Sequence, residues 1–123
     1  MKKIYATVLV AAALIATPAM PSEITLGRWC DRMLPNLPRY NRTIEIVISE
    51  AHTPIARNSF ADGSTNEQIL EELGGDLYAV SESPSGDRYR VVASSGDLQL
   101  LDGDGIIRTA GRLENTLRDG ECR

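Results

Sequence analysis

Turn-forming residues recur at an even spacing through the second half of the chain, and this spacing constrains the fold more than any other feature. Clusters of Gly, Asp, Ser and Pro stand at residues 62–64, 74–76, 84–87, 95–97 and 102–105. Short apolar or alternating segments separate them. Strands joined by turns at such regular intervals are typical of an antiparallel meander, which builds small sandwiches and barrels.

The segments between the turns have the pattern of strands. Residues 43–49 alternate cleanly, with three isoleucines on one face. Residues 88–93 alternate in the same way, with Tyr89 predicted to face inward and Arg88 outward. Further strands are expected at 78–80, 98–100 and 106–110, with a weaker one at 55–61.

One segment, residues 64–73, fits either a helix or a strand. It opens with Ser-Thr-Asn-Glu, a capping-box pattern, and Ile69, Leu70 and Leu73 fit a short helical face. The same residues fit one arm of a hairpin that turns at Gly74. A short isolated helix gains little by itself, so the surrounding meander favours the strand. Short helices are also expected at 113–118 and 31–34.

These segments sum to seven or eight antiparallel strands, an all-β fold with one or two short helices at most. Closure into a small barrel removes the unpaired edges of such a sheet. Cys30 lies on the first strand and Cys122 follows the last. In an oxidising compartment they are expected to form a disulfide that clasps the barrel, the alternatives being free thiols or an intermolecular bond.

The start of the chain has the features of an export signal. Lys2 and Lys3 precede an apolar run at 4–16, and Thr-Pro-Ala follows at 17–19. The run is shorter than the ~20 residues of a spanning helix, which argues against a membrane anchor. We therefore expect a signal peptide at 1–19, a single small domain at 20–123, and a periplasmic or secreted location.

The charge of the predicted mature domain limits its partners. Residues 20–123 contain 11 arginines, no lysine and 17 acidic residues, a net charge of −6. An acidic domain argues against nucleic acid or an anionic membrane surface as a partner. It suits another protein as the partner, a basic one included, and the absence of lysine excludes Schiff-base chemistry.

The chain offers little for catalysis or metal binding. His52 is the one histidine, and the disulfide accounts for both cysteines, so no Ser-His-Asp or Cys-His arrangement can be assembled. Residues 102–105, Asp-Gly-Asp-Gly, resemble the start of a calcium loop, but Leu113 stands where its final glutamate belongs. A hairpin turn is the favoured alternative. We expect a protein that is not an enzyme, with no metal and no cofactor.

Residues 27–29, Gly-Arg-Trp, resemble the Gly-x-Trp motif of the lipocalins. In that family the tryptophan plugs one end of a barrel and is often covered by an arginine from the last strand. The resemblance implies structural roles for Gly27 and Trp29, with Arg108 or Arg112 stacking on the indole. A core tryptophan packed on the disulfide is the favoured alternative. The family also implies an apolar ligand, held in an interior lined by Ile44, Ile46, Val91, Leu98 and Leu100.

A second resemblance concerns residues 85–89, Ser-Gly-Asp-Arg-Tyr. They resemble the Ser-Gly-x-x-Tyr loop of the periplasmic inhibitors of c-type lysozyme, which are small disulfide-bearing β-barrels. In that family the serine loop enters the lysozyme cleft and a lysine on the next loop joins it; here the next loop, 94–97, has no lysine. An ordinary hairpin turn is the alternative. The resemblance implies partner contacts by Ser85, Gly86, Asp87, Arg88 and Tyr89.

The sequence thus predicts an exported, non-enzymatic binding protein, with inhibition of a hydrolase such as c-type lysozyme as the sharpest instance. The alternatives are a small lipocalin-like carrier of an apolar ligand and an accessory subunit of a periplasmic complex.

Overall fold

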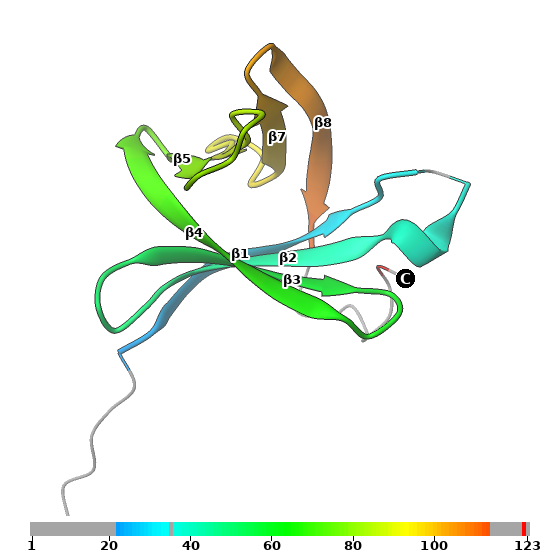
Figure 1. The fold of residues 1–123 in the computed structure, drawn as a ribbon, viewed down its shortest axis with the longest axis horizontal. Helices are drawn as coiled ribbons and strands as arrows, with labels where there is room; N and C mark the ends of the chain where they lie inside the picture. Colours follow the sequence, from blue (N-terminus) through cyan, green and yellow to red (C-terminus); the bar gives the residue numbers. More distant parts are fainter. Residues whose placement is uncertain (1–21, 35, 114–121, 123) are drawn as a thin grey trace, which may run out of the picture.

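The computed structural model describes residues 22–34, 36–113 and 122, which form an eight-stranded antiparallel barrel (Figure 1). The strands follow one another around the barrel in sequence order. The predicted all-β meander that closes into a barrel is confirmed. The strands are β1 Ile24–Asp31, β2 Arg42–Ile48, β3 Pro54–Phe60, β4 Thr65–Gly74, β5 Leu77–Val80, β6 Arg88–Val91, β7 Leu98–Asp102 and β8 Gly105–Arg112.

The segment at 64–73, for which helix and strand were both open, forms most of β4. Its first half pairs with β3 and its second half with β5. Backbone groups along β4 therefore find partners on neighbouring strands, which is a tertiary effect that no local pattern reports. The turn into β5 contains Gly74 and Gly75 at φ values of 94° and 61°, a region that favours glycine. The preference for a strand is confirmed.

Two expected helices have different outcomes. The helical turn at 31–34 is wrong, because Asp31 is the last residue of β1 and pairs with Arg42. A single turn of 3-10 helix, η1, forms instead at Pro38–Tyr40. The helix expected at 113–118 lies, apart from Leu113, outside the described residues, and so does the expected signal peptide. In the described part of the chain, no helix is long and apolar enough to cross a membrane.

The barrel closes where β8 meets β1, and this seam is short. Its register consists of Trp29 opposite Arg112 and Cys30 opposite Gly111. The backbone N–H of Leu113 adds a hydrogen bond to the carbonyl of Arg28, at 2.9 Å. The predicted disulfide is present: Cys30 and Cys122 are joined across 92 residues of sequence. It ties the chain beyond β8 to β1.

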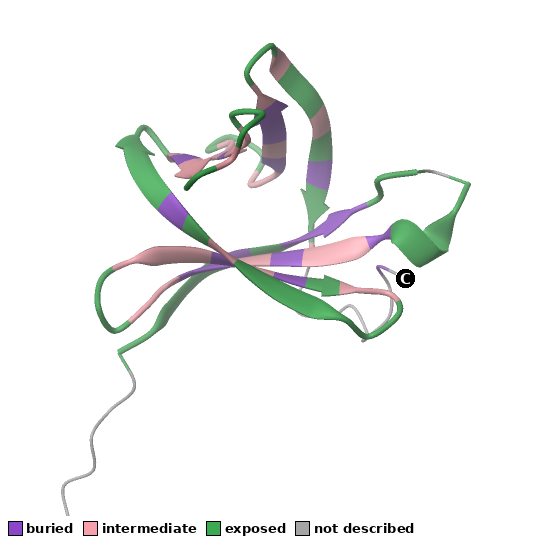
Figure 2. Ribbon diagram, viewed as in Figure 1, coloured by how far each residue is buried: buried purple, intermediate pink, exposed green. Residues whose placement is uncertain are grey.

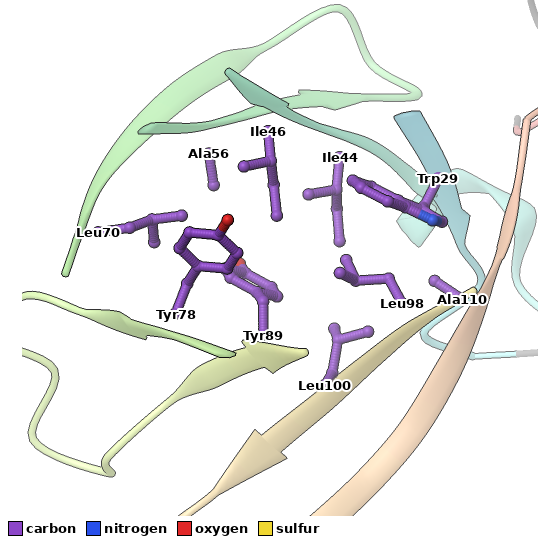
Figure 3. Close-up of a cluster of buried hydrophobic side chains, with 10 residues drawn as sticks. All are labelled: Trp29, Ile44, Ile46, Ala56, Leu70, Tyr78, Tyr89, Leu98, Leu100 and Ala110. Atoms are coloured by element: carbon purple, nitrogen blue, oxygen red, sulfur yellow. The ribbon is translucent and has the colours of Figure 1, made fainter. Parts of the chain in front are cut away.

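Each of the eight strands contributes at least one side chain to a single apolar core (Figure 3). Buried and exposed residues alternate along the strands, as the bands in Figure 2 show, because successive side chains point to opposite faces. The core consists of Trp29, Ile44, Ile46, Ala56, Leu70, Tyr78, Tyr89, Leu98, Leu100 and Ala110.

Antiparallel order sends alternate connections to opposite ends of the barrel. The β1–β2, β3–β4, β5–β6 and β7–β8 connections share one end, and the β2–β3, β4–β5 and β6–β7 connections share the other. We call the first the arginine end, for Arg42 and Arg108, and the second the tryptophan end, for Trp29. The two ends differ in chemistry.

Candidate functional site

The tryptophan end is closed by the indole of Trp29, which is fully buried. Its Nε1 donates a 2.7 Å hydrogen bond to the carbonyl of Gly96 in the β6–β7 loop. Gly27 lies on the same face of β1, and a Cβ there would approach the indole carbons Cζ2 and Cη2 to 2.7 Å. Only glycine therefore leaves room for the ring at this position.

The two arginines expected to stack on the indole differ in their position. Arg112 is opposite Trp29 in the register, but its side chain lies beside Gly96, 3.3 Å from where a Cβ of that glycine would stand. Arg108 lies at the arginine end, bonded to Asp31. Among the described residues, neither stacks on the indole; a cation–π contact joins Arg39 and Tyr40 instead.

Trp29 also does not share a face with the disulfide. Trp29 points into the barrel, so its neighbour Cys30 points out of it. The alternative of a tryptophan packed on the disulfide is therefore wrong, although Trp29 is a core residue.

The loop expected to contact a partner, residues 81–87, connects β5 and β6 at the arginine end. Ser85 and Gly86 are exposed. Ser83 Oγ accepts the backbone N–H of Asp87 at 3.1 Å, and Ser85 Oγ donates to the carboxylate of Asp87 at 3.1 Å. The carbonyl of Ser85 accepts the N–H of Gly103 at 3.0 Å, which fastens the loop to the β7–β8 turn. The loop is thus held by its own hydrogen bonds and by a neighbouring turn.

The last two of the five predicted contact residues lie deeper. Arg88 is half-buried, and its Nη2 donates to the carbonyl of Asp102 at 2.8 Å. Tyr89 is buried in the core, and its hydroxyl donates to Oε1 of Gln68 at 2.5 Å. Burial raises the pKa of this hydroxyl, although the nearby Arg42 acts to lower it. Of the five predicted contact residues, Ser85 and Gly86 therefore lie on the surface, and Asp87 is half-buried.

The β7–β8 connection is the hairpin turn that the Asp-Gly-Asp-Gly run favoured. Asp102 pairs with Gly105, and Oδ1 of Asp102 accepts the N–H of Asp104 at 2.8 Å. His52 lies exposed in the β2–β3 loop at a φ of 63°. The described residues hold no cluster of three or more histidine, cysteine or acidic side chains that suits a metal ion.

The arginine end contains a polar cluster inside the barrel, and sequence reasoning did not find it. Asp31 is fully buried. Arg108 donates to both of its oxygens, at 2.6 and 2.7 Å, and Nε of Arg42 adds a bond of 2.8 Å. Burial opposes ionisation of Asp31, but the hydrogen bonds from Arg108 and Arg42 prevail and hold its pKa below the ordinary value. The same bonds raise the pKa of Arg108.

The cluster continues from Arg42 toward β4. Nη1 of Arg42 donates to Oδ1 of the buried Asn58 at 3.2 Å. Nδ2 of Asn58 donates to Oδ1 of Asn66 at 2.9 Å and to Oε1 of Gln68 at 3.0 Å. With the bond from Tyr89 to Gln68, one network joins strands β1, β2, β3, β4, β6 and β8.

A sequence signal for this cluster existed. Arg42 precedes Ile44 by two residues on β2, and Asn58 follows Ala56 by two on β3. Strict alternation therefore places both polar side chains on the inner face. Polar residues at inward positions are the expected mark of a buried network.

Comparisons of the chain with protein-family models, with curated proteins and with solved structures find no match.

Proposed function

We propose that this protein is a non-enzymatic protein-binding module that engages a basic partner through the 81–87 loop, with c-type lysozyme as the first partner to test. The observation that carries the proposal is the loop itself. Exposed Ser85 and Gly86 stand on a loop that is already held by internal bonds and by Gly103. A preorganised loop loses little conformational freedom on binding, which favours affinity.

Charge near the loop supports a basic partner. Asp87 is the last residue of the loop, and Asp102 and Asp104 lie at the β7–β8 turn that is bonded to it. Carboxylates gathered around one exposed loop speed association with a cationic surface and fix its orientation. The disulfide supports an exported protein, since such bonds persist mainly in oxidising compartments.

The carrier alternative receives less support from the interior. Four of the five residues expected to line a ligand cavity are buried in the core cluster, and Val91 packs against it. Side chains that contact one another in this way fill a small barrel, as expected for eight strands.

The test is a titration of purified, disulfide-bonded protein against c-type lysozyme in a cell-wall lysis assay. We expect inhibition, and Ser85→Tyr weakens it by about tenfold or more because the ring obstructs the loop surface. The matched control is Ser64→Tyr, on the β3–β4 loop at the same end, where Ser64 also bonds an aspartate, Asp62.

Two results would count against the proposal. No inhibition at micromolar excess rejects lysozyme as the partner. Equal loss in the Ser85→Tyr and Ser64→Tyr variants rejects the 81–87 loop as the contact surface, since only the first of these substitutions alters it.

A further inference from the structure

The buried polar cluster of the arginine end pairs two arginines with one carboxylate. Arg42 and Arg108 share a single carboxylate, that of Asp31, and all three of its hydrogen bonds come from these two side chains. Among the described residues, neither arginine forms an ion pair with a second acidic side chain. A surplus cationic charge in a partly desolvated place attracts an anion more strongly than an exposed arginine does.

The cluster also leaves more hydrogen-bond donors than acceptors without a partner. The side-chain oxygens of Asn58, Asn66 and Gln68 each accept at least one bond, and that of Gln68 accepts two. In contrast, the described residues provide no hydrogen-bond acceptor for Nη1 of Arg108, whereas Arg42 also interacts with the hydroxyl of Tyr89. The side-chain nitrogens of Asn66 and Gln68 also lack an acceptor. Within this network, the side-chain groups that lack a partner are therefore donors.

These donors reach water. Within the described part of the chain, one buried side-chain polar atom lacks a hydrogen-bond partner, Oδ1 of Asn41. The donors of the cluster that lack a partner are therefore not fully buried. Exposure increases from Asp31 at 0% to Arg42 at 13% and Arg108 at 27%, and Asn66 is exposed. The network thus leads from the solvent at Asn66 and Arg108 inward to Asp31.

We propose that the arginine end binds a carboxylate group through Arg42 and Arg108, with Asn66 and Gln68 as further donors. The guanidinium fork matches the two oxygens of a carboxylate, and the surplus of one charge suits a monoanion. A dianion such as phosphate is a poorer match, because two arginines against the one carboxylate of Asp31 leave a single positive charge. This site does not depend on partner binding by the 81–87 loop.

The test uses the intact, disulfide-bonded protein and acetate as the probe, with chloride adjusted to keep the ionic strength constant. Binding is followed by NMR of the arginine Nε–Hε resonances. We expect saturable shifts for Arg42 and Arg108. N-acetyl-alanine distinguishes the source of the carboxylate, and its amide is the control that lacks the carboxylate. Tighter binding of N-acetyl-alanine than of acetate indicates a peptide C-terminus, and equal binding indicates a free small acid.

The decisive variant is Asn66→Asp, which keeps the oxygen that accepts from Asn58 and adds a carboxylate at the mouth of the site. We expect acetate affinity to fall by about tenfold, the worth of one charge-assisted hydrogen bond. Thr65→Asp is the matched control, because the adjacent exposed residue carries the same charge change on the other face of β4. It leaves the affinity nearly unchanged.

The proposal is overturned if acetate causes no saturable shift of the two arginines beyond that of chloride. It is also overturned if Thr65→Asp lowers the affinity as much as Asn66→Asp, because the effect is then one of net charge and not of a local site.

Discussion

The two ends of the barrel interior are built from the same alternating strands but are stabilised in different ways. At the tryptophan end, the indole of Trp29 lies on Gly27 and bonds one carbonyl. At the arginine end, Asp31 holds two arginines in a network that reaches Tyr89. Packing stabilises through contact area and is insensitive to pH, whereas an ionic network depends on protonation and on the completeness of its partners. The two ends should therefore respond differently to substitution and to pH.

The largest effect is expected at the tryptophan end. Trp29→Ala removes a fully buried aromatic side chain and should lower the free energy of unfolding by about 3–5 kcal/mol. Chemical denaturation with the disulfide intact measures this. Trp29→Phe is the control, since it keeps a ring but loses the bond to Gly96. The loss in Trp29→Ala should be the same at pH 7 and at acidic pH, and a strongly pH-dependent loss would contradict the distinction between the two ends.

A somewhat smaller effect is expected at the arginine end. Asp31→Asn keeps the shape but leaves two guanidinium groups without their carboxylate. The substitution should lower the free energy of unfolding by about 2–4 kcal/mol at pH 7. This is somewhat less than the loss for a fully buried ion pair, because both arginines retain some contact with water. Denaturation of both proteins under identical conditions measures the difference.

The pH dependence of this difference has a definite sign. The folded pKa of Asp31 lies below its ordinary value of 3.8. Its stabilising contribution is therefore complete above the ordinary aspartate pKa and is lost as the pH falls through the folded pKa. The gap between wild type and Asp31→Asn should narrow over that acidic range. A gap that stays constant as the pH falls would show that the arginine end is not stabilised by ionised Asp31.

The smallest effect is expected for Gly27→Ala. The added methyl group would stand 2.7 Å from two indole carbons, so the ring or the strand has to shift. Overpacking of this kind should cost about 1–3 kcal/mol, measured by denaturation, and should alter the fluorescence of Trp29. Gly111→Ala on β8 is the control, because nothing lies within 4 Å of a Cβ there. Equal losses of stability in both variants would mean that backbone entropy, and not contact with the indole, is the reason for glycine at position 27.

Prediction from the sequence succeeded where the signal was local and repeated. Even turn spacing and alternation gave the strands, and the cysteine pair gave the disulfide, because turn residues and period-two patterns act within a few residues. It failed where a distant residue decided the outcome. Asp31 extends β1, against the expected helical turn, because it pairs with Arg42 on β2, 11 residues away. Arg108, one of the two arginines considered for stacking on Trp29, bonds Asp31 instead, a partner that was not visible in the sequence.

Of the predicted contact residues, the structure leaves Ser85 and Gly86 on the surface and places Tyr89 in the core. The alternation of the strand had predicted that Tyr89 faces inward, whereas the resemblance to the inhibitor loop implied that it contacts a partner. The anchoring of the loop to Gly103 could not be predicted, because it requires the β5–β6 and β7–β8 connections to meet at one end.

By itself, the sequence determined the chain of strands, their inner and outer faces, and the two cysteines available for a bond. Only the tertiary structure decided how β1 and β8 meet, and that closure brings Arg108 to Asp31 and the tryptophan to the opposite end from the arginines. The physical reason is that periodicity specifies which face a side chain takes, whereas the register around a closed barrel specifies which side chains it meets.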